Sequence, residues 1–497
     1  MTDADLLASS YARLRASLSS RRDDTLPSAA LLSAAESSLP RPDHLGYLLP
    51  RGAEKTLDHL HEAIVPALNG QNLSGRYLGF VTGSTLPVAE AADNIVSALD
   101  QNVQVHLPDQ TVCTAVEDAA TGMLASLVGL DPAVWNGRTF TTGATASNVL
   151  GLACGREFVI AAKKAGASVA ELGLLGACGL AGVREVRVLT SMAHSSLFKA
   201  AAVLGIGRAS VRQLPVSEAE PWRLDLSAVE AALKDEGVVS IIAISAGEVN
   251  TGRFATVSME EMSRVRKLAD RYGAWIHVDG AFGVFARVLP DTEEFARVRQ
   301  FADGMHLADS ITADGHKLLN VPYDNGIFLC RHKSMQHAVF QNPNAAYLAS
   351  GGASAIPSPL NMGIENSRRF RALPAYAVLL SEGRNGIADM FARMVRFARR
   401  VAGYIRDSEA YELLPDGDAT AAEFGLEAVH IIVLFRARDE RLNEELVGRV
   451  NGTRKMYVSG TSWAGKKACR IAVSSWRVDV EKDFEVVREV LESVARR

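Results

Sequence analysis

Hydrophobic positions along the chain alternate between strand-like and helix-like patterns from about residue 110 to residue 335. Four short apolar runs, bounded by polar or glycine-containing segments, have the length and β-branched content of buried strands: VREVRVL, VVSIIAIS, AWIHVD and GIFLC. Longer stretches with helical periodicity, such as SNVLGLACGREFVIAAKK, separate such runs. Because nearly unbroken apolar strands need cover on both faces, this alternation predicts an α/β domain with a mostly parallel sheet.

The pattern changes after about residue 385. A helical stretch at 386–407 is followed by EAVHIIVLF, a helix at 439–450, KMYVSG, CRIAVSS and a last helix near 480–495. Strands accompanied by few helices favour a smaller α+β domain at this end of the chain. We therefore expect three parts: an N-terminal helical segment at 1–100, a large domain at 101–385 and a C-terminal domain at 386–497.

Composition and charge narrow the classes of partner. The chain has 497 residues, of which 48% are hydrophobic and 22% charged, as in ordinary soluble proteins. Its net charge of −4 gives no basic surface for nucleic acid or for an anionic membrane. No apolar run approaches the roughly 20 residues that span a bilayer. We therefore expect neither a nucleic-acid partner nor a membrane partner.

Cysteine usage and the N-terminus both favour a cytoplasmic protein. The five cysteines are scattered, odd in number and without C-x-x-C spacing, which argues against a disulfide framework and against a zinc site. The N-terminus, MTDADLLASSYARLRASLSSRRDD, lacks the apolar core of a secretory signal, and its aspartates argue against a transit peptide. We expect a cytoplasmic location, a helical start and no metal site.

The stretch ADGHKLLNVPYDNG places Lys317 where a polar turn gives way to an apolar segment. Most lysines in such a place are solvated at the edge of a strand. The alternative is a lysine that forms a Schiff base, because burial disfavours the ammonium and releases a free amine near neutral pH. The apolar LLNVP that follows is consistent with burial, and the residues upstream of Lys317 decide between the two interpretations.

An acidic residue ends the predicted strand AWIHVD, and small residues follow it. Asp279 therefore lies at the carboxyl end of a buried strand, where open α/β sheets bind ligands, although an isolated aspartate often only caps a turn. Pyridoxal phosphate (PLP) chemistry uses the same arrangement, with a carboxylate facing the pyridine nitrogen. Such a charge pair at 4 Å contributes about 4 kcal/mol at an effective dielectric of 20, which keeps the ring nitrogen protonated. A protonated ring withdraws electrons from the substrate.

Two further segments have features of a phosphate site and of a stacking site. In FTTGATASNVLGL, a strand at 138–142 meets a turn of small residues and then a helix, whose first amides can hold a phosphate; many βα turns look alike. In TSMAHSSLFKAA, His194 precedes Ser-Ser, a plausible N-cap pair. His194 is either structural or lies flat over a planar cofactor. The segment GTSWAGKK is not a P-loop, because Lys467 replaces the required Ser or Thr and no buried strand precedes it.

Six segments, in this order, carry a resemblance to a known family: TTGATASN, AHSS, EVNTG, HVDGAFG, DSITADGHK and SRRFRALP. Over about residues 45–490 the chain resembles the group II PLP-dependent amino acid decarboxylases of fold type I, such as the aromatic amino acid and glutamate decarboxylases. The resemblance implies the PLP-dependent transferase fold, PLP as the cofactor and an amino acid as the substrate. It also implies a homodimer, with the N-terminal segment contributing to the dimer and to the substrate pocket.

The resemblance assigns roles residue by residue. Three residues are implied to be catalytic: Lys317 as the Schiff-base lysine, Asp279 as the acid on the pyridine nitrogen, and His194 as the imidazole stacked on the ring. Other residues are implied to contact the cofactor: Ala281 on the opposite ring face, Ala144 and Thr145 at the phosphate, His316 near the phosphate or the Schiff base, and Asn250 at the 3′-hydroxyl. Phe80 and His106 match positions that line the substrate pocket, and ordinary packing is an equally good interpretation of both.

One expected residue is missing. Decarboxylases of this family carry a tyrosine on a loop between the lysine and the SRRFR segment, and this tyrosine protonates the carbanion after carbon dioxide leaves. The corresponding stretch, LASGGASAIPSPLNMGIEN, contains no Tyr, His or Lys, and Glu365 is its one ionisable side chain. Tyr347 precedes this stretch but matches another position of the family. Either another group or water donates the proton, or the chemistry differs.

The resemblance favours decarboxylation of an L-amino acid to its amine and carbon dioxide. Tyr77, Phe80 and His106 favour an aromatic or hydrophobic substrate, and Arg368, Arg369 and Arg371 either bind an anion or form surface ion pairs. The missing loop tyrosine keeps two alternatives open: oxidative decarboxylation-deamination to an aldehyde, or another PLP reaction such as aminotransfer or retro-aldol cleavage. A non-catalytic binding or scaffold subunit is a third alternative, which the joint presence of lysine, aspartate and histidine argues against.

Overall fold

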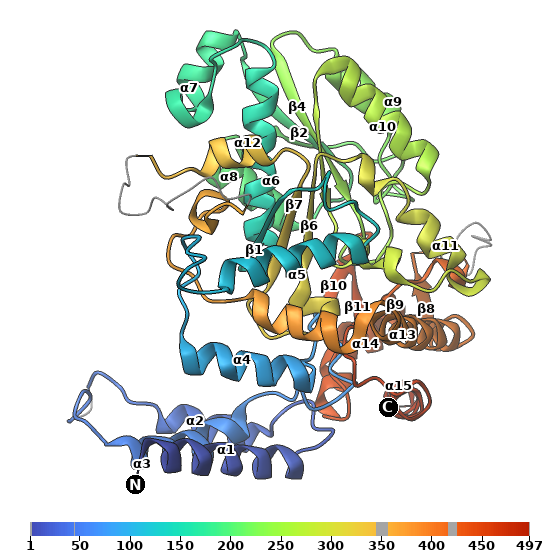
Figure 1. Ribbon diagram of the computed structural model, residues 1–497. Helices are drawn as coiled ribbons and strands as arrows, with labels where there is room; N and C mark the ends of the chain where they lie inside the picture. Colours follow the sequence, from blue (N-terminus) through green and yellow to red (C-terminus); the bar gives the residue numbers. More distant parts are fainter. Residues whose placement is uncertain (1, 44, 344–355, 416–424, 497) are drawn as a thin grey trace.

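The computed structural model describes residues 2–43, 45–343, 356–415 and 425–496 (Figure 1). A large α/β domain forms the upper part of Figure 1, and the C-terminal domain packs beside its lower end. The first helices lie apart from both, below α4 (Pro87–Leu99). The two predicted classes of domain are therefore present.

A seven-stranded sheet forms the centre of the large domain. Its strands are β1 (Gly137–Thr141), β2 (Glu185–Thr190), β3 (Val211–Gln213), β4 (Val238–Ser245), β5 (Trp275–Asp279), β6 (Ser310–Asp314) and β7 (Gly326–Cys330). The spatial order is β1-β7-β6-β5-β4-β2-β3, and all pairs are parallel except those that β7 makes with β6 and with β1. The prediction of a mostly parallel sheet is confirmed.

Helices cover both faces of this sheet, and each face has its own core. The helices are α5 (Cys113–Leu127), α6 (Ala144–Ala161), α7 (Val169–Ala181), α8 (Ser195–Val203), α9 (Leu226–Leu233), α10 (Met259–Tyr272), α11 (Glu293–Phe301) and α12 (Lys333–Phe340). Every residue of β4 is buried. Its Ile242 and Ile244 belong to one hydrophobic cluster and its Ile241 and Ala243 to the other, because successive side chains point to opposite faces.

The C-terminal domain begins along the long helix α13 (Ala372–Arg406), which has a kink at Gly383, where φ is +58°. An antiparallel sheet in the order β10-β11-β9-β8 follows, made of β8 (Tyr411–Leu414), β9 (Ile432–Ala437), β10 (Ser459–Trp463) and β11 (Lys466–Ala472). The helix α14 (Glu440–Gly452) packs on this sheet, and α15 (Val480–Ala495) packs against α13 and α14. The GTSWAGKK segment forms the β10–β11 hairpin, in agreement with its rejection as a P-loop. The exact domain boundaries stay predictions.

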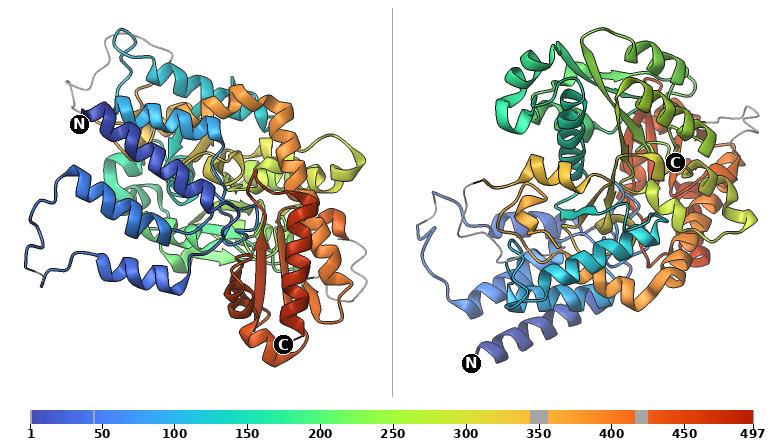
Figure 2. Two further views of the ribbon diagram at one scale, coloured as in Figure 1. Left: turned by 90° about the horizontal axis from the view of Figure 1, so that it is seen from below. Right: turned by 45° about the horizontal axis from the view of Figure 1, so that its top comes forward.

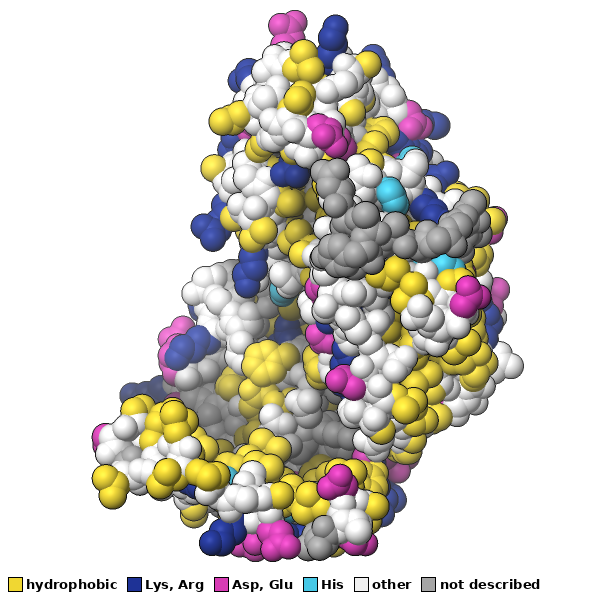
Figure 3. All heavy atoms as spheres, turned by 60° about the vertical axis from the view of Figure 1, so that its left-hand side comes forward, with side chains coloured by type: hydrophobic (Ala, Val, Ile, Leu, Met, Phe, Trp, Pro, Cys, Tyr) yellow, Lys and Arg dark blue, Asp and Glu magenta, His cyan; other side chains and the backbone are white. Residues whose placement is uncertain are grey.

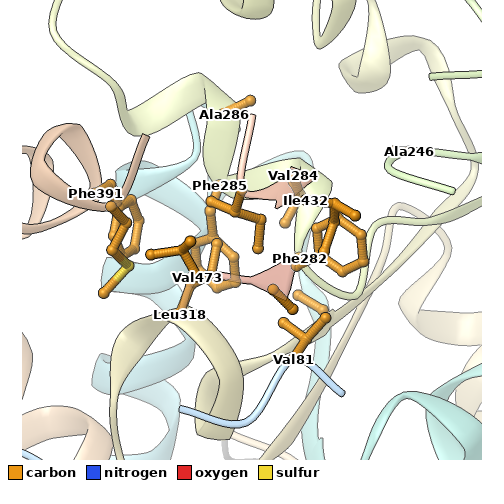
Figure 4. Packing of buried hydrophobic residues seen from close by; sticks show 14 of the residues in the cluster. Val81, Ala246, Phe282, Val284, Phe285, Ala286, Leu318, Phe391, Ile432 and Val473 are labelled. Carbon is orange, nitrogen blue, oxygen red and sulfur yellow. The ribbon is translucent and has the colours of Figure 1, made fainter. Parts of the chain in front are cut away.

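The two domains share one hydrophobic core (Figure 4). The segment that follows β5 brings Phe282 and Phe285 into this core, where Phe285 packs edge-on against Phe391 of α13. Ile432 of β9 and Val473, which follows β11, join the same cluster from the C-terminal domain. Burial of about 25 cal/mol per Å² of apolar surface makes this shared core the main force that holds the domains together.

The N-terminal helices form an arm that extends from the body of the molecule (Figure 2). They are α1 (Asp3–Ser20), α2 (Ala29–Ser38) and α3 (Ala53–His59). No residue of α1 is buried, and its contacts include ion pairs such as that between Arg13 and Asp58, 2.7 Å apart. We call residues 2–68, without residue 44, the N-terminal arm.

Two general features concern the helices and the cysteines. None of the helices in the described part of the chain combines the length and the apolarity that a membrane crossing requires. All five cysteines carry free thiols, and burial raises the pKa of the Cys469 thiol. The cysteines therefore act as small hydrophobic side chains in this fold.

Candidate active site

A cavity of about 470 Å³ opens at the carboxyl ends of the parallel strands. Asp279 at the end of β5, Asp314 at the end of β6 and Ser245 at the end of β4 line its floor. The turns after β1 and β2 complete the wall, because all these strands end at the same edge of the sheet. This is the edge at which open α/β sheets bind ligands.

Lys317 reaches this cavity from a single π-helical turn, Gly315–Leu319, directly after β6. Its Nζ lies 2.8 Å from Oδ2 of the buried Asp314. The neighbours Leu318 and Leu319 are buried in the core, as the sequence predicted, so the turn is anchored while the amine points into the cavity. Lys317 is thus neither solvated at a strand edge nor fully buried: its side chain is 22% exposed.

The first turn of α6 forms the second wall. Gly143, Ala144 and Thr145 line the cavity at the N-terminus of this 18-residue helix. The backbone N–H of Ala144 donates to Oδ1 of Asp314 over 2.7 Å. Because the first amides of a helix carry a partial positive charge, this turn is a suitable cradle for an anionic group. The strand–turn–helix arrangement that the sequence predicted is confirmed.

Asp279 faces the same cavity and is held by two donors. The side-chain amide of Asn148, on α6, donates to Oδ2 over 2.9 Å, and the backbone N–H of Ala281 donates to Oδ1 over 3.3 Å. Ala281 itself lines the cavity, so a small side chain stands beside the carboxylate. On this side of the cavity, a flat ring would meet no bulky side chain.

His194 also lines the cavity and is itself the N-cap of α8. Its Nδ1 accepts from the backbone N–H of Ser196 over 3.1 Å and contacts the Ser196 hydroxyl at 2.7 Å. The expectation of a Ser-Ser N-cap pair is therefore wrong, because the imidazole satisfies the amide that a serine was expected to satisfy. Desolvation in the cavity wall lowers the pKa of His194, so the neutral ring is favoured at neutral pH.

His316 and Tyr323 close the cavity next to Lys317. Nδ1 of His316 accepts from the backbone N–H of Asn325 over 3.1 Å, and the two rings lie 4.3 Å apart at an angle of 31°. Burial lowers the pKa of His316, and desolvation raises the pKa of the Tyr323 phenol. Both side chains therefore stay neutral near pH 7, and Tyr323 keeps its proton.

The comparison with protein families identifies the family of this chain. A family model described as "Pyridoxal-dependent decarboxylase conserved domain" matches residues 80–427. The chain belongs to this family. It is an enzyme of the PLP-dependent decarboxylase class, and PLP is its cofactor. The resemblance seen in the sequence is confirmed.

Individual relatives agree with this assignment. The L-2,4-diaminobutyrate decarboxylase of Acinetobacter baumannii is 30% identical over 325 residues, which are 63% of this chain and 58% of that protein. Tryptophan decarboxylase 1 of Oryza sativa is 25% identical over 84% of this chain and 80% of its own length. The crystal structure of Oryza sativa TDC with PLP and tryptamine superimposes with a TM-score of 0.80 at 21% identity, over 99% of this chain and 97% of that one, which shows the shared fold.

The residues of the cavity fit the cofactor of this decarboxylase class. An amine (Lys317), a carboxylate (Asp279) and a helix N-terminus (Ala144, Thr145) line one cavity, and these are the groups that suit the aldehyde, the ring nitrogen and the phosphate of PLP. Glycine at position 83 is required nearby. A Cβ there would lie 2.1 Å from the carbonyl oxygen of Lys317, so a side chain would displace the lysine turn.

Three further residues singled out in the sequence differ in their placement. Phe80 lines the mouth of the cavity and is 59% exposed. His106 and Asn250 are not among the cavity-lining residues of this chain. His106 is buried and contacts the Thr114 hydroxyl at 2.8 Å, and Asn250 Oδ1 accepts from Thr461 over 2.7 Å. The roles suggested for these three residues stay predictions.

The arginines after the loop have partners within the protein. Arg368 pairs with Glu117 inside the protein, Arg369 lies 2.7 Å from Asp93, and Arg371 lies 2.7 Å from Asp324. None of the three lines the cavity. Ion pairing is the better interpretation, although only Arg369 is at the surface. Residues 348–355 of the stretch expected to carry a loop tyrosine, and Tyr347 before it, lie outside the described residues.

Arg470 is a cavity residue that sequence reasoning missed, as it missed Asp314 and Tyr323. It comes from β11 of the C-terminal domain and donates to the carbonyl oxygens of Val249 (2.7 Å) and Phe80 (2.6 Å). Its Nε is buried and has no hydrogen-bond partner among the described residues. A cation inside the apolar run CRIAVSS was the signal that could have pointed to it, because arginine is seldom buried without a role.

Proposed function

We propose that this protein decarboxylates an L-amino acid with an aromatic or hydrophobic side chain, giving the amine and carbon dioxide. The observation that carries the proposal is the convergence of Lys317, Asp279 and His194 on one cavity. When bound, PLP supplies an aldehyde that captures the substrate amine and a ring that accepts the electrons of the broken bond. The protein's part is to bind, to orient and to move protons.

Each wall of the cavity has a distinct task in this proposal. Lys317 holds the cofactor covalently, and Asp279 keeps a proton on the pyridine nitrogen. The N-terminus of α6 binds the phosphate through the amide and the hydroxyl of Thr145, next to Ala144, whose own amide donates to Asp314. His194 and Ala281 flank the ring. They fix the plane of the ring and therefore the orientation of the substrate relative to it.

The remaining lining favours an apolar substrate side chain. Phe80, Val249, Phe282 and Tyr323 also line the cavity. Among the described lining residues the carboxylates are Asp279 and Asp314, and both have partners. A substrate with a cationic side chain would find no free carboxylate among them. Arg470 is positioned to attract the substrate carboxylate, since its guanidinium reaches the cavity from the opposite domain.

Tyr323 is the proton donor that we propose for the step after carbon dioxide leaves. Its phenol lies in the cavity beside His316 and next to the turn that carries Lys317. Because desolvation raises its pKa, the phenol is protonated throughout the physiological range. It supplies the type of group that the family places on the loop and that the stretch LASGGASAIPSPLNMGIEN lacks.

Oxidative decarboxylation-deamination to an aldehyde is the second candidate reaction. The missing loop tyrosine favours it, because a slow transfer of a proton to the substrate leaves time for dioxygen, the oxidant of this route, to react and be reduced to peroxide. The product distinguishes the two: an amine without ammonia indicates simple decarboxylation, whereas an aldehyde with ammonia and peroxide indicates the oxidative route.

A homodimer is also part of the proposal. Large apolar side chains of the N-terminal arm are exposed, among them Leu7, Tyr11, Leu31, Leu32, Leu48 and Leu49. Figure 3 shows hydrophobic side chains gathered on the lower part of the molecule, below a hollow. Exposed apolar surface of this extent is typical of an interface. Light scattering during gel filtration tests this, and a monomer at micromolar concentration would contradict it.

The deciding experiment has two stages. The purified protein is incubated with PLP and treated with borohydride, and peptide mass spectrometry locates the reduced adduct, which we expect on Lys317. The variant Lys317→Ala should give no adduct and no turnover, whereas Lys199→Ala, which removes an exposed lysine of α8, should behave as wild type. Product analysis across a panel of amino acids then measures amine, carbon dioxide, aldehyde and ammonia. An adduct on another lysine overturns the proposal.

A further inference from the structure

A row of buried polar side chains lies behind Asp279 and is not part of the cavity wall. It starts at the indole of Trp275, whose Nε1–H donates to Oγ of Ser310 over 3.0 Å. Ser310 contacts Nδ1 of His277 at 2.8 Å, and Nε2 of His277 lies 2.9 Å from Oδ1 of Asn148. Trp275, Ser310, His277 and Asn148 are all fully buried. The row therefore connects the interior of the sheet to the carboxylate that faces the cavity.

The amide of Asn148 is a branch point. Its Nδ2 donates to Oδ2 of Asp279 over 2.9 Å and also to Oγ of Ser196 over 3.1 Å. Ser196 in turn contacts Nδ1 of His194 at 2.7 Å. One buried side chain thus supports both the acid at the ring edge and the imidazole at the ring face.

The direction of every hydrogen bond in the row is determined. An indole N–H only donates, so the Ser310 hydroxyl accepts from Trp275. The NH₂ group of Asn148 faces Asp279, because the reverse orientation would place its oxygen against a carboxylate, and two acceptors do not bond. Oδ1 of Asn148 therefore accepts from Nε2–H of His277, and in the neutral ring Nδ1 then accepts the proton of the Ser310 hydroxyl. Burial lowers the pKa of His277 to about 4, which agrees with a neutral ring.

The packing around His277 leaves room for this ring. A Cβ at Gly151, on α6, would lie 2.3 Å from the imidazole, so the helix can pass His277 only with a glycine at this point. Buried polar groups cost stability unless they are satisfied, and a hydrophobic side chain would fill the site without that requirement. A fully satisfied row that ends on Asp279 is therefore better explained by what it does to Asp279 than by packing.

We propose that Asn148 and His277 are positioning residues that hold the Asp279 carboxylate toward the pyridine nitrogen of the cofactor. His277 fixes the orientation of the Asn148 amide, and Asn148 fixes the carboxylate and, through Ser196, the imidazole of His194. The inference rests on the cofactor placement given under the proposed function, and it is independent of the substrate and of the reaction.

The test measures binding of two cofactors to the apoprotein: PLP, and 1-deaza-PLP, whose ring carries CH in place of the nitrogen. If Asn148 and His277 act through Asp279, the variants Asn148→Leu and His277→Leu weaken the binding of PLP about tenfold, equivalent to about 1.4 kcal/mol. Their affinity for 1-deaza-PLP should stay within about twofold of that of wild type. This cycle isolates the contact between Asp279 and the ring nitrogen. His277→Gln, whose amide can accept from Ser310 and donate to Asn148, should restore PLP binding to within about threefold.

Ser196→Ala is the matched control, because it cuts the branch to His194 and keeps the branch to Asp279. It should leave the ratio of the two dissociation constants unchanged. If the leucine variants weaken the binding of both cofactors equally, the row only supports packing, and this overturns the inference. So does a His277→Gln variant that binds no better than His277→Leu. If the leucine variants do not fold, Asn148→Ser, whose hydroxyl is too short to reach Asp279, takes their place. A failure to decarboxylate any amino acid leaves these binding results unaffected.

Discussion

Lys317 and Asp279 illustrate what determines chemistry at the scale of single residues. Both are ordinary residue types, and both receive their proposed function from their neighbours: Asp314 holds the amine, and Asn148 holds the carboxylate. Lys317 was recognisable in the sequence because the segment DSITADGHK and the motifs upstream of it resemble those of a known family. Asn148 was not, because an asparagine within TTGATASN carries no pattern of its own.

Replacement of Asp279 should separate charge from shape. Asp279→Ala removes the carboxylate that we place on the pyridine nitrogen, so we expect kcat for carbon dioxide release to fall about 100-fold, corresponding to roughly 3 kcal/mol in the barrier. Asp279→Asn keeps the size of the side chain and loses its charge, so kcat of this variant should fall by a comparable factor. Near-normal kcat in either variant, with PLP bound, would contradict the assigned role.

Tyr323→Phe tests the proposed proton donor. The phenylalanine ring keeps the packing on His316 and loses only the hydroxyl, so cofactor binding should stay close to that of wild type. We expect amine formation to fall 10- to 100-fold, as is typical when an acid–base group is removed, and the aldehyde share of the products to rise. Product ratios by chromatography decide this, and an unchanged ratio at an unchanged rate excludes Tyr323.

At the scale of elements, close backbone approaches place the lysine turn. The segment before α4 passes Gly315–Leu319 so closely that Gly83 has no room for a Cβ, and the turn itself is one π-helical turn rather than a strand edge. A hydrophobic pattern predicts strands and helices because backbone geometry repeats every 2 or 3.6 residues. It contains no information on which turn approaches which segment, so this contact was not predictable.

Gly83→Ala should disturb the site without touching a catalytic side chain. The new Cβ meets backbone carbonyls of Lys317 and His316 at 2.1 and 2.4 Å, and backbone yields less easily than the end of a side chain. We expect at least a tenfold loss of PLP affinity in a folded protein, measured by cofactor absorbance. Gly179→Ala on α7, where a Cβ meets nothing within 4 Å, is the control and should bind PLP as wild type.

The domain interface belongs to the scale of the whole molecule. Arg470 and Phe282 reach the cavity region from different domains, and the shared core around Phe285 and Phe391 fixes their relation (Figure 4). His430 lies in this core, with its ring 6.3 Å from that of Phe282. Burial and the nearby Arg399 lower the pKa of His430 to about 3. The interface therefore holds a histidine that must stay uncharged.

Acid should weaken this interface. The unfolded state takes up a proton at His430 below about pH 6.5, whereas the folded state does so only near pH 3, so stability rises with pH across this window and is lost as the pH falls through it. His277, with a pKa of about 4, acts in the same direction. We expect the urea concentration at the midpoint of unfolding of the apoprotein to be lower at pH 5 than at pH 7. His430→Phe should reduce this fall, and an identical pH profile in the variant would contradict the prediction.

The sequence alone determined the alternation of strands and helices, the two classes of domain and the family, because periodicity and short motifs are local properties of the chain. It also indicated Lys317, Asp279 and His194. The tertiary structure decided which distant residues meet: Arg470 beside Phe80, Tyr323 against His316, and Asn148 between Asp279 and His277. Such contacts depend on how the elements pack, and packing is a property of the whole fold that no single segment encodes.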